Sequence, residues 1–312
     1  ANIDLNGLPW TPIGSRTTTG FRGHFDGGGN VITNMTVRTV EDDFPDAGLF
    51  GTTEFGATIS NVILRNGRIP EDAGYGCAAL LVGNGRSLTV ESCKVDGTVS
   101  SVNISGGIIA EVDGYFKVSN CEVDVDCFGR QYSGGIIGSG YDFYSPCTIE
   151  SCTVKGRISR ESSSDAGGIA AYLQGDVTIS DCKSYADLDC GTVQSSSIGG
   201  IVGDLKGGKV KDCSVYGRIN CGPIGGNNAV VGGVFGTATD VTISGLKFEG
   251  YMAVDERCNN TTDIEYTGYF IEMIANSITV TDKCTYRKAG TKELKAVASY
   301  PEGVDITKIE AI

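Results

Sequence analysis

The stretch Gly134-Gly135-Ile136-Ile137-Gly138 is followed by Ile149-Glu-Ser-Cys152 and then by one more apolar residue, Ile158. This three-part unit recurs along the chain. Its first block reads small-small-aliphatic-aliphatic-small, and neighbouring copies lie 28 to 35 residues apart. Clear copies begin at Ala47, Gly106, Gly134, Gly167, Gly199 and Gly232, and degenerate copies occupy 78–82 and 267–271.

The second block ends in one apolar column, and a third apolar position follows six residues later in most copies. The segments are rich in Val, Ile, Thr and Cys, with Gly, Asn, Asp and Ser between them, which predicts three short strands per repeat and few helices. A coil of about 31 residues buries its inner face only by stacking on its neighbours. We therefore expect an all-β fold, a single-stranded parallel β-helix of about eight to nine coils with capped ends. The column comprises Val62, Cys93, Cys121, Cys152, Cys182, Cys213 and Leu246.

Composition limits the function classes. The chain has 312 residues, 46 of them Gly, and a net charge of −13, which argues against nucleic acid or an anionic membrane as the main partner. A single His excludes any two-His metal site. No run of residues is suited to a transmembrane helix. We expect one monomeric β-helix domain over 1–312, with 1–30 as the N-terminal coil or cap and 285–312 as a C-terminal cap or junction.

The twelve cysteines are placed as core residues rather than as a disulfide framework. Val62 and Leu246 share the column of five cysteines, so that column is predicted to face the core as reduced, buried thiols. Cys127 and Cys147 fall in other apolar columns and receive the same interpretation. Collinear ligands do not form a tetrahedral site, so we expect no metal there. Two disulfides stay open at this stage: Cys190–Cys221 and Cys258–Cys284.

No set of residues predicts catalysis. His24 is expected to be exposed, and Asp26 to cap a turn through its own side chain. The acidic run Glu41-Asp42-Asp43 with Asp46 is expected to be a solvated loop. Five residues after the core column the charges alternate, which indicates lateral strand support and leaves no paired carboxylates for acid–base work. We therefore expect no catalytic residue and no cofactor. This charged column comprises Thr98, Asp126, Arg157, Asp187, Arg218 and Tyr251.

One loop is the best candidate for binding. Between the first and second strands most repeats use four to six residues, whereas the repeat at 134 has the longer segment 139–146. Exposed aromatic side chains beside an aspartate would stack on sugar rings or anchor a protein partner. The alternative is that they only cover the edge of the coil. The predicted ligand-binding residues are Tyr115, Tyr141, Asp142, Phe143, Tyr144 and Tyr172.

The N-terminal region carries a family resemblance. It reads Trp10-Thr-Pro-Ile-Gly14, then Phe21-Arg-Gly-His-Phe-Asp-Gly27, and then Gly48-Leu-Phe-Gly51. Over residues 8 to 250 this pattern resembles the GLUG-motif proteins, which are bacterial, mostly exported, right-handed β-helices. Similar repeats occur in surface proteins of gut-dwelling anaerobes and beside the protease domain of immunoglobulin A proteases. The resemblance implies export, a cell-surface or extracellular location and an adhesive role, without a defined ligand or catalytic residues.

We therefore expect a non-catalytic, adhesin-like surface module that binds a host or dietary glycan or a surface protein. Two alternatives stay open. A carbohydrate-active β-helix enzyme, a polysaccharide lyase or hydrolase, would need a carboxylate cluster in a groove. A structural stalk that presents another domain would have uniform faces.

Overall fold

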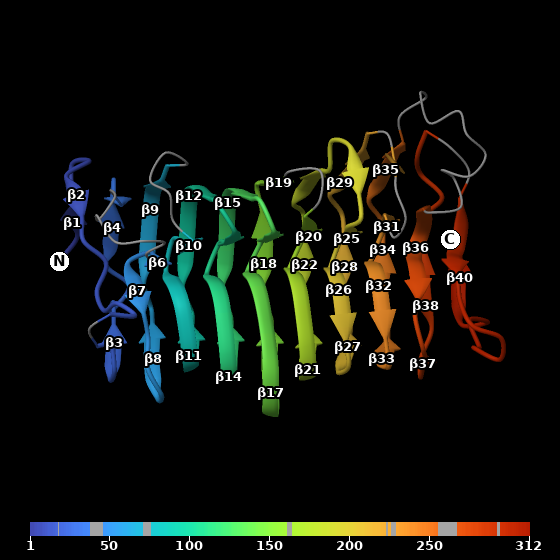
Figure 1. The fold of residues 1–312 in the computed structure, drawn as a ribbon, viewed down its shortest axis with the longest axis horizontal. Coiled ribbons are helices and arrows are strands. Elements are labelled where there is room, and N and C mark those ends of the chain that lie inside the picture. The colour runs from blue at the N-terminus through green and yellow to red at the C-terminus, as the bar shows by residue number, and fades with distance from the viewer. Residues whose placement is uncertain are drawn as a thin grey trace.

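The computed structural model describes residues 1–17, 19–37, 46–70, 76–160, 164–222, 224–225, 229–254, 267–291 and 294–312. Over these residues the chain forms a parallel β-solenoid of about eight turns, and no helix is present among them. Figure 1 shows the coils side by side along the long axis of a rod, with the N-terminus at one end and the C-terminus at the other. The predicted fold class is confirmed.

Each coil supplies strands to two long sheets. The first and second strands of the coils belong to a 21-stranded sheet, and the third strands belong to a 17-stranded sheet. The first strands are β6 (Asp46–Ala47), β10 (Cys77–Ala79), β13 (Ile104–Gly106), β16 (Tyr132–Gly134), β20 (Asp165–Gly167), β25 (Ser197–Gly199), β31 (Val230–Gly232) and the start of β36 (Thr267–Ile274).

The second strands are often longer than the sequence indicates. They are β3 (His24–Asp26), β7 (Phe50–Thr52), β8 (Ala57–Ser60), β11 (Val82–Glu91), β14 (Ile109–Ser119), β17 (Ile137–Glu150), β21 (Ala170–Ser180), β26 (Val202–Lys206), β27 (Lys209–Lys211), β32 (Phe235–Thr239), β33 (Val241–Ser244), β37 (Ile278–Val280) and β39 (Lys295–Ser299). The predicted loop over 139–146 is wrong, because these residues belong to β17, which absorbs the extra length in two register shifts.

The third strands complete the coils. They are β1 (Ile3–Asp4), β2 (Pro9–Trp10), β4 (Val31–Thr33), β5 (Thr36–Val37), β9 (Ile63–Ile69), β12 (Lys94–Ser101), β15 (Glu122–Gly129), β18 (Thr153–Lys155), β19 (Arg157–Arg160), β22 (Lys183–Ser184), β23 (Asp187–Asp189), β28 (Ser214–Val215), β29 (Arg218–Cys221), β34 (Lys247–Phe248), β35 (Tyr251–Val254), β38 (Cys284–Tyr286) and β40 (Ile309–Ala311). A further pair, β24 (Val193–Gln194) and β30 (Ile224–Gly225), forms a 2-stranded sheet.

The cysteine column lies in the core, as predicted. Its five cysteines form no disulfide, and these residues, Val62 and Leu246 are at most 1% exposed. Cys152 is typical, since its Sγ lies 3.2 Å from the carbonyl oxygen of Glu150. In another apolar column, burial raises the pKa of the Cys127 thiol, which keeps that thiol protonated. Cys190 and Cys284 are buried, whereas Cys258 and the side chain of Cys221 lie outside the described residues.

The N-terminal residues are paired with the coils that follow them. β1 pairs with β4, and β2 pairs with β5. The rings of Phe21 and Phe25 lie 4.7 Å and 5.4 Å from the ring of Phe50. His24 is exposed, and the Oδ1 atom of Asp26 accepts the Gly28 N–H at 2.8 Å, as expected for a turn cap.

The alternating charged column is present, but it does not form the expected ladder of side-chain pairs. Arg157 lies in register with Asp187, yet its guanidinium bonds to Asp189. The carboxylate of Asp126 accepts the backbone N–H of Arg157 at 2.9 Å. The aspartates of this column therefore bind the backbone of the next coil rather than its arginine side chains.

Candidate binding groove

A groove lies over the turn from the first to the second strand in the three coils that contain Ile104, Tyr132 and Tyr172. The turn requires glycine, because a Cβ at Gly134 would lie 1.9 Å from the Ile137 carbonyl oxygen and one at Gly167 would lie 1.8 Å from that of Ala170. After the turn a second small residue is needed, since a Cβ at Gly203 would lie 2.6 Å from the Ser197 carbonyl oxygen. This close approach brings outward side chains of the two strands face to face.

Two columns of side chains, the first-strand wall and the second-strand wall, flank this turn along the rod. In three contacts a first-strand residue meets the second-strand residue of the next coil, whereas Asp46 meets Thr52 of its own coil. The Sγ of Cys77 lies 3.5 Å from the Oε2 of Glu111, and the Oγ of Ser197 lies 3.1 Å from the Oγ1 of Thr237. The first-strand wall comprises Asp46, Cys77, Ile104, Tyr132, Asp165, Ser197 and Val230. The second-strand wall comprises Thr52, Asn84, Glu111, Ser139, Tyr172, Asp204 and Thr237.

Arg16 closes the N-terminal end of the groove. Its Nε bonds to the Oδ2 of Asp46 at 2.7 Å, and its Nη2 bonds to the Oε2 of Glu111 at 2.9 Å. The expectation that Asp46 lies in a solvated loop is wrong, because Asp46 is 7% exposed and also accepts the Thr52 hydroxyl. Burial raises the pKa of Asp46 even though Arg16 favours its charged form. The rest of that predicted loop, Glu41-Asp42-Asp43, lies outside the described residues.

Glu111 positions a tyrosine at the rim. Its Oε1 accepts the Tyr141 hydroxyl at 2.7 Å, and its Oε2 accepts the Asn84 amide at 2.7 Å. Burial and this bond to Glu111 raise the pKa of the Tyr141 phenol. The Tyr141 side chain is nevertheless 38% exposed. A ring that is fixed at its hydroxyl and open to solvent is suited to contact with a ligand.

A cavity of about 400 Å³ lies beside Tyr141 in this groove. Its floor includes Ser139, which is 1% exposed and whose Oγ has no hydrogen-bond partner among the described residues. The rings of Tyr132 and Tyr172 pack at 5.6 Å on one side. Two amides and one carboxylate also face the cavity, but no lysine or arginine does. The lining residues are Ile104, Glu111, Gln131, Tyr132, Ser139, Tyr141, Tyr172 and Gln174.

Two successive coils each add one carboxyl group to these walls. Asp165 follows Tyr132 in register, and Asp204 follows Tyr172. The Nζ of Lys206 lies 3.3 Å from the Oδ2 of Asp204 and 4.9 Å from the centre of the Tyr172 ring. Burial raises the pKa of Asp165 to about 7, and it also raises the pKa of Asp204. Perturbed carboxyl groups in a groove mark a candidate functional site.

The structure brings together only part of the predicted binding set. Tyr141 and Tyr172 both line the cavity, whereas Tyr115 is 42% exposed and does not line it. The side chains of Asp142, Phe143 and Tyr144 lie outside the described residues.

Sequence reasoning missed Tyr132, Ser139, Glu111, Asp165 and Asp204. The charge pattern was analysed on the third-strand column and not on the first two strands. The missing signal was positional, because these residues stand two residues before the small-aliphatic block or directly after it. The block itself was placed one residue early in two repeats. Register aligns Val82 with Ile109, and Ile271 with Phe235, so these copies occupy 79–83 and 268–272.

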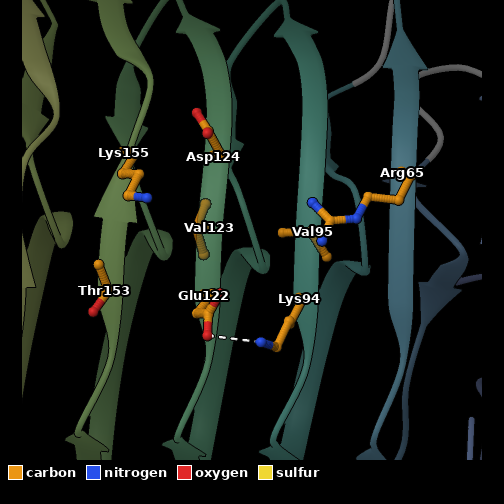
Figure 2. Close-up of a pocket in the computed structure, with 8 residues that line it drawn as sticks. All are labelled: Arg65, Lys94, Val95, Glu122, Val123, Asp124, Thr153 and Lys155. Carbon is orange, nitrogen blue, oxygen red and sulfur yellow. Dashed lines mark hydrogen bonds and ion pairs between the residues drawn. The ribbon is translucent and has the colours of Figure 1, made fainter. Parts of the chain in front are cut away.

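A second cavity, of about 500 Å³, lies on the third-strand sheet, and Figure 2 shows its residues. Three of its charged residues take part in ion pairs. Lys94 bonds to Glu122 at 2.8 Å, and Arg65 bonds to Asp96 at 2.6 Å. The bond from Lys94 lowers the pKa of Glu122. No aromatic residue lines this cavity, so it lacks a surface on which a sugar ring would stack.

Two further searches of the described residues gave no site. No group of three or more His, Cys, Asp or Glu residues in this part of the chain is placed to hold a metal ion. Nor does the described part of the chain contain a helix that is long and apolar enough to cross a membrane.

Comparison with known proteins adds little. No family model matches the chain, and no curated protein matches it in sequence. Among solved structures, the chain is similar to a protein from Bacteroides ovatus described as "a putative immunoglobulin A1 protease". The TM-score is 0.45 and the identity is 17%, over 100% of this chain and 75% of that one. At this level of likeness neither fold nor function is transferred, and the function is inferred from the groove.

Proposed function

We propose that this chain is an exported surface protein of the GLUG-motif type that binds a neutral glycan in the groove beside Tyr141. The observation that carries this proposal is the cavity itself, with three tyrosine rings around the buried Ser139 hydroxyl, which has no hydrogen-bond partner among the described residues. Tyrosine rings bind the apolar faces of sugars, and hydroxyl, amide and carboxylate groups bind sugar hydroxyls. Export and a surface location rest on the resemblance of the N-terminal motifs.

The charge of the site selects the ligand class. Glu111 faces the cavity and no cationic residue lines it, while the whole chain carries a net charge of −13. A sialylated or uronate-rich glycan would bring its carboxylates close to Glu111, whose ion-pair partner Arg16 is already shared with Asp46. A neutral glycan avoids this cost.

A glycan array with neutral, sialylated and uronate-containing glycans tests the proposal. We expect neutral glycans to bind, and Tyr141→Ala to weaken that binding about tenfold or more, which corresponds to about 1.4 kcal/mol. Tyr115→Ala is the matched control, because Tyr115 has nearly the same exposure but lies outside the cavity. Ser139→Ala should weaken binding without loss of stability, because its hydroxyl bonds to no residue in the described part of the chain.

Two outcomes would count against this function. If Tyr115→Ala weakens binding and Tyr141→Ala does not, the site is in the wrong place. If no glycan on the array binds, the groove is structural and the stalk alternative stands.

A further inference from the structure

Asp165 follows Tyr132 on the first-strand wall, and Asp204 follows Tyr172 on the second-strand wall. On both sides of these two acids a first-strand residue contacts the second-strand residue of the next coil, as in Tyr132 with Tyr172 and Ser197 with Thr237. The same relation pairs Asp165 with Asp204, and the charge of Asp204 acts on Asp165. A glycan that extends from the cavity toward the C-terminal end of the rod meets this pair next.

The fold does not require acids at these two places. Ser197 and Thr237 occupy the equivalent positions one coil later and form a simple hydroxyl contact of 3.1 Å. Two carboxyl groups in these equivalent positions are costly to bury. Their presence therefore calls for a role other than support of the coil.

The surroundings of the two acids differ in a way that separates their roles. The Oδ1 of Asp165 accepts the backbone N–H of Ser197 at 2.7 Å, whereas the Oδ2 of Asp204 bonds to Lys206. The other oxygen of Asp204, Oδ1, has no partner among the described residues. Asp204, Arg160 and Lys206 are the charged groups that act on Asp165, and burial outweighs the two cations. Burial therefore raises the pKa of Asp165 to about 7, so that part of the population carries a proton there at neutral pH, while the bond from Lys206 opposes the effect of burial on Asp204.

We propose that Asp165 and Asp204 are the acid and the base of a hydrolase that cleaves the glycan held in the groove. This inference rests on the proposed glycan binding and goes beyond the non-catalytic role expected from the sequence. Asp165 gives its proton to the bridging oxygen as the bond from that oxygen to the anomeric carbon breaks. Asp204 takes a proton from the water whose oxygen forms the new bond to that carbon. Water is the only co-reactant, and the proton returns from Asp204 to Asp165 before the next turnover.

The test uses cellohexaose, xylohexaose, mannohexaose, laminarihexaose and chitohexaose with the full chain. Binding is measured by calorimetry, and shorter products are measured by mass spectrometry. We expect the bound hexasaccharide to be cleaved, and we expect Asp165→Asn and Asp204→Asn each to slow cleavage about 100-fold or more with affinity changed less than threefold. Asp187→Asn, an exposed aspartate in β23, is the control and should leave the rate unchanged.

Two further readouts separate catalysis from support of the fold. In the wild-type chain the rate should fall as pH rises through about 7, because Asp165 then loses its proton. Azide should restore cleavage by the Asp204→Asn variant. It should leave the rate of the Asp187→Asn variant unchanged, because that variant is expected to cleave as fast as the wild type. Melting temperatures show whether the Asp165→Asn and Asp204→Asn variants are folded. If they are not folded, the pH profile of the wild-type chain still tests the role of Asp165.

The outcomes distinguish this inference from the function beneath it. If the wild-type chain binds a hexasaccharide and leaves it intact, the acid–base pair is refuted and glycan binding stands. If folded Asp165→Asn cleaves at the wild-type rate, the assignment of the acid is wrong. If none of the hexasaccharides binds, the proposed function fails and the hydrolase fails with it.

Discussion

At the scale of single residues, the cysteine column behaves as a run of small apolar side chains. Cys152 packs where Val62 and Leu246 pack in other coils, with its Sγ 3.2 Å from one backbone carbonyl oxygen and 3.9 Å from another. A thiol tolerates such contacts because it is a weak donor and is otherwise apolar. The column therefore contributes packing between coils rather than chemistry.

Replacement of Cys152 tests this interpretation. Cys152→Ser should lower the free energy of unfolding by about 1–3 kcal/mol, because it buries a more polar and smaller group. Cys152→Val should cost less, because Val62 already occupies the equivalent place. Denaturant unfolding measures both. Rapid labelling of Cys152 by a thiol reagent in the native wild-type chain would contradict its burial.

Glu272 is a second residue whose setting predicts a measurable effect. It takes the place that Gly236 has in the preceding coil, is 2% exposed, and its Oε2 has no partner among the described residues. Burial raises its pKa from 4.5 to about 8. The folded chain therefore holds a proton there that the unfolded chain releases between these pH values, so stability falls as pH rises from about 4.5 to 8.

Glu272→Gln should remove this pH dependence. We expect its free energy of unfolding to match the wild type near pH 4 and to exceed it by at least about 1 kcal/mol at pH 9. Glu302→Gln, at an exposed glutamate, should change neither value. A constant difference between Glu272→Gln and the wild type at all pH values would show that Glu272 is not buried in its neutral form.

At the scale of elements, the turn between the second and third strands repeats one backbone conformation. The residue just before the cysteine column has φ between 52° and 60° in seven coils. Non-glycine residues rarely adopt this region, and asparagine, aspartate and glycine tolerate it best. This explains why the position holds only Asn, Ser, Asp or Gly. Its members are Asn61, Ser92, Asn120, Ser151, Asp181, Asp212 and Gly245.

Ser151 offers a direct test of this turn, because it is exposed and its φ is 55°. Ser151→Val should lower the free energy of unfolding by about 1–2 kcal/mol, and Ser151→Gly should raise it by about 0.5 kcal/mol. Thr153→Val is the control, since Thr153 lies in β18 with ordinary strand geometry. Equal stabilities for Ser151→Val and Ser151→Gly would show that the left-handed backbone carries no cost here.

The sequence predicted the coils and the core but not the groove, for a physical reason. Core positions admit a narrow range of side chains, so Val62, Cys152 and Leu246 reveal one column by their likeness. The groove walls have no such restriction, since Tyr132 and Asp165 are neighbours in one column. Only the close approach of two strands at the glycine turn makes these positions face each other, and that approach depends on the folded backbone.

At the scale of the whole molecule, one contiguous core extends from Met35 to Ile309. The chain carries a charge of −13, and several of its groove acids are buried enough to have raised pKa values. The groove crosses from coil to coil, so a ligand that fills it contacts several repeats at once. Binding should therefore stabilise neighbouring coils together rather than a single turn.

The two chain ends lie at opposite ends of the rod, and the hydrogen bonds between coils run along its length (Figure 1). Tension applied between the ends therefore acts in line with those bonds. An end coil has a neighbour on one side only, so it should peel away first and expose the next. Stretched in an optical trap, the protein should lengthen in many small, low-force steps of ~100 Å, the length of about 31 extended residues. As a tether it would yield gradually under load, whereas a single large rupture would show that all coils break as one unit.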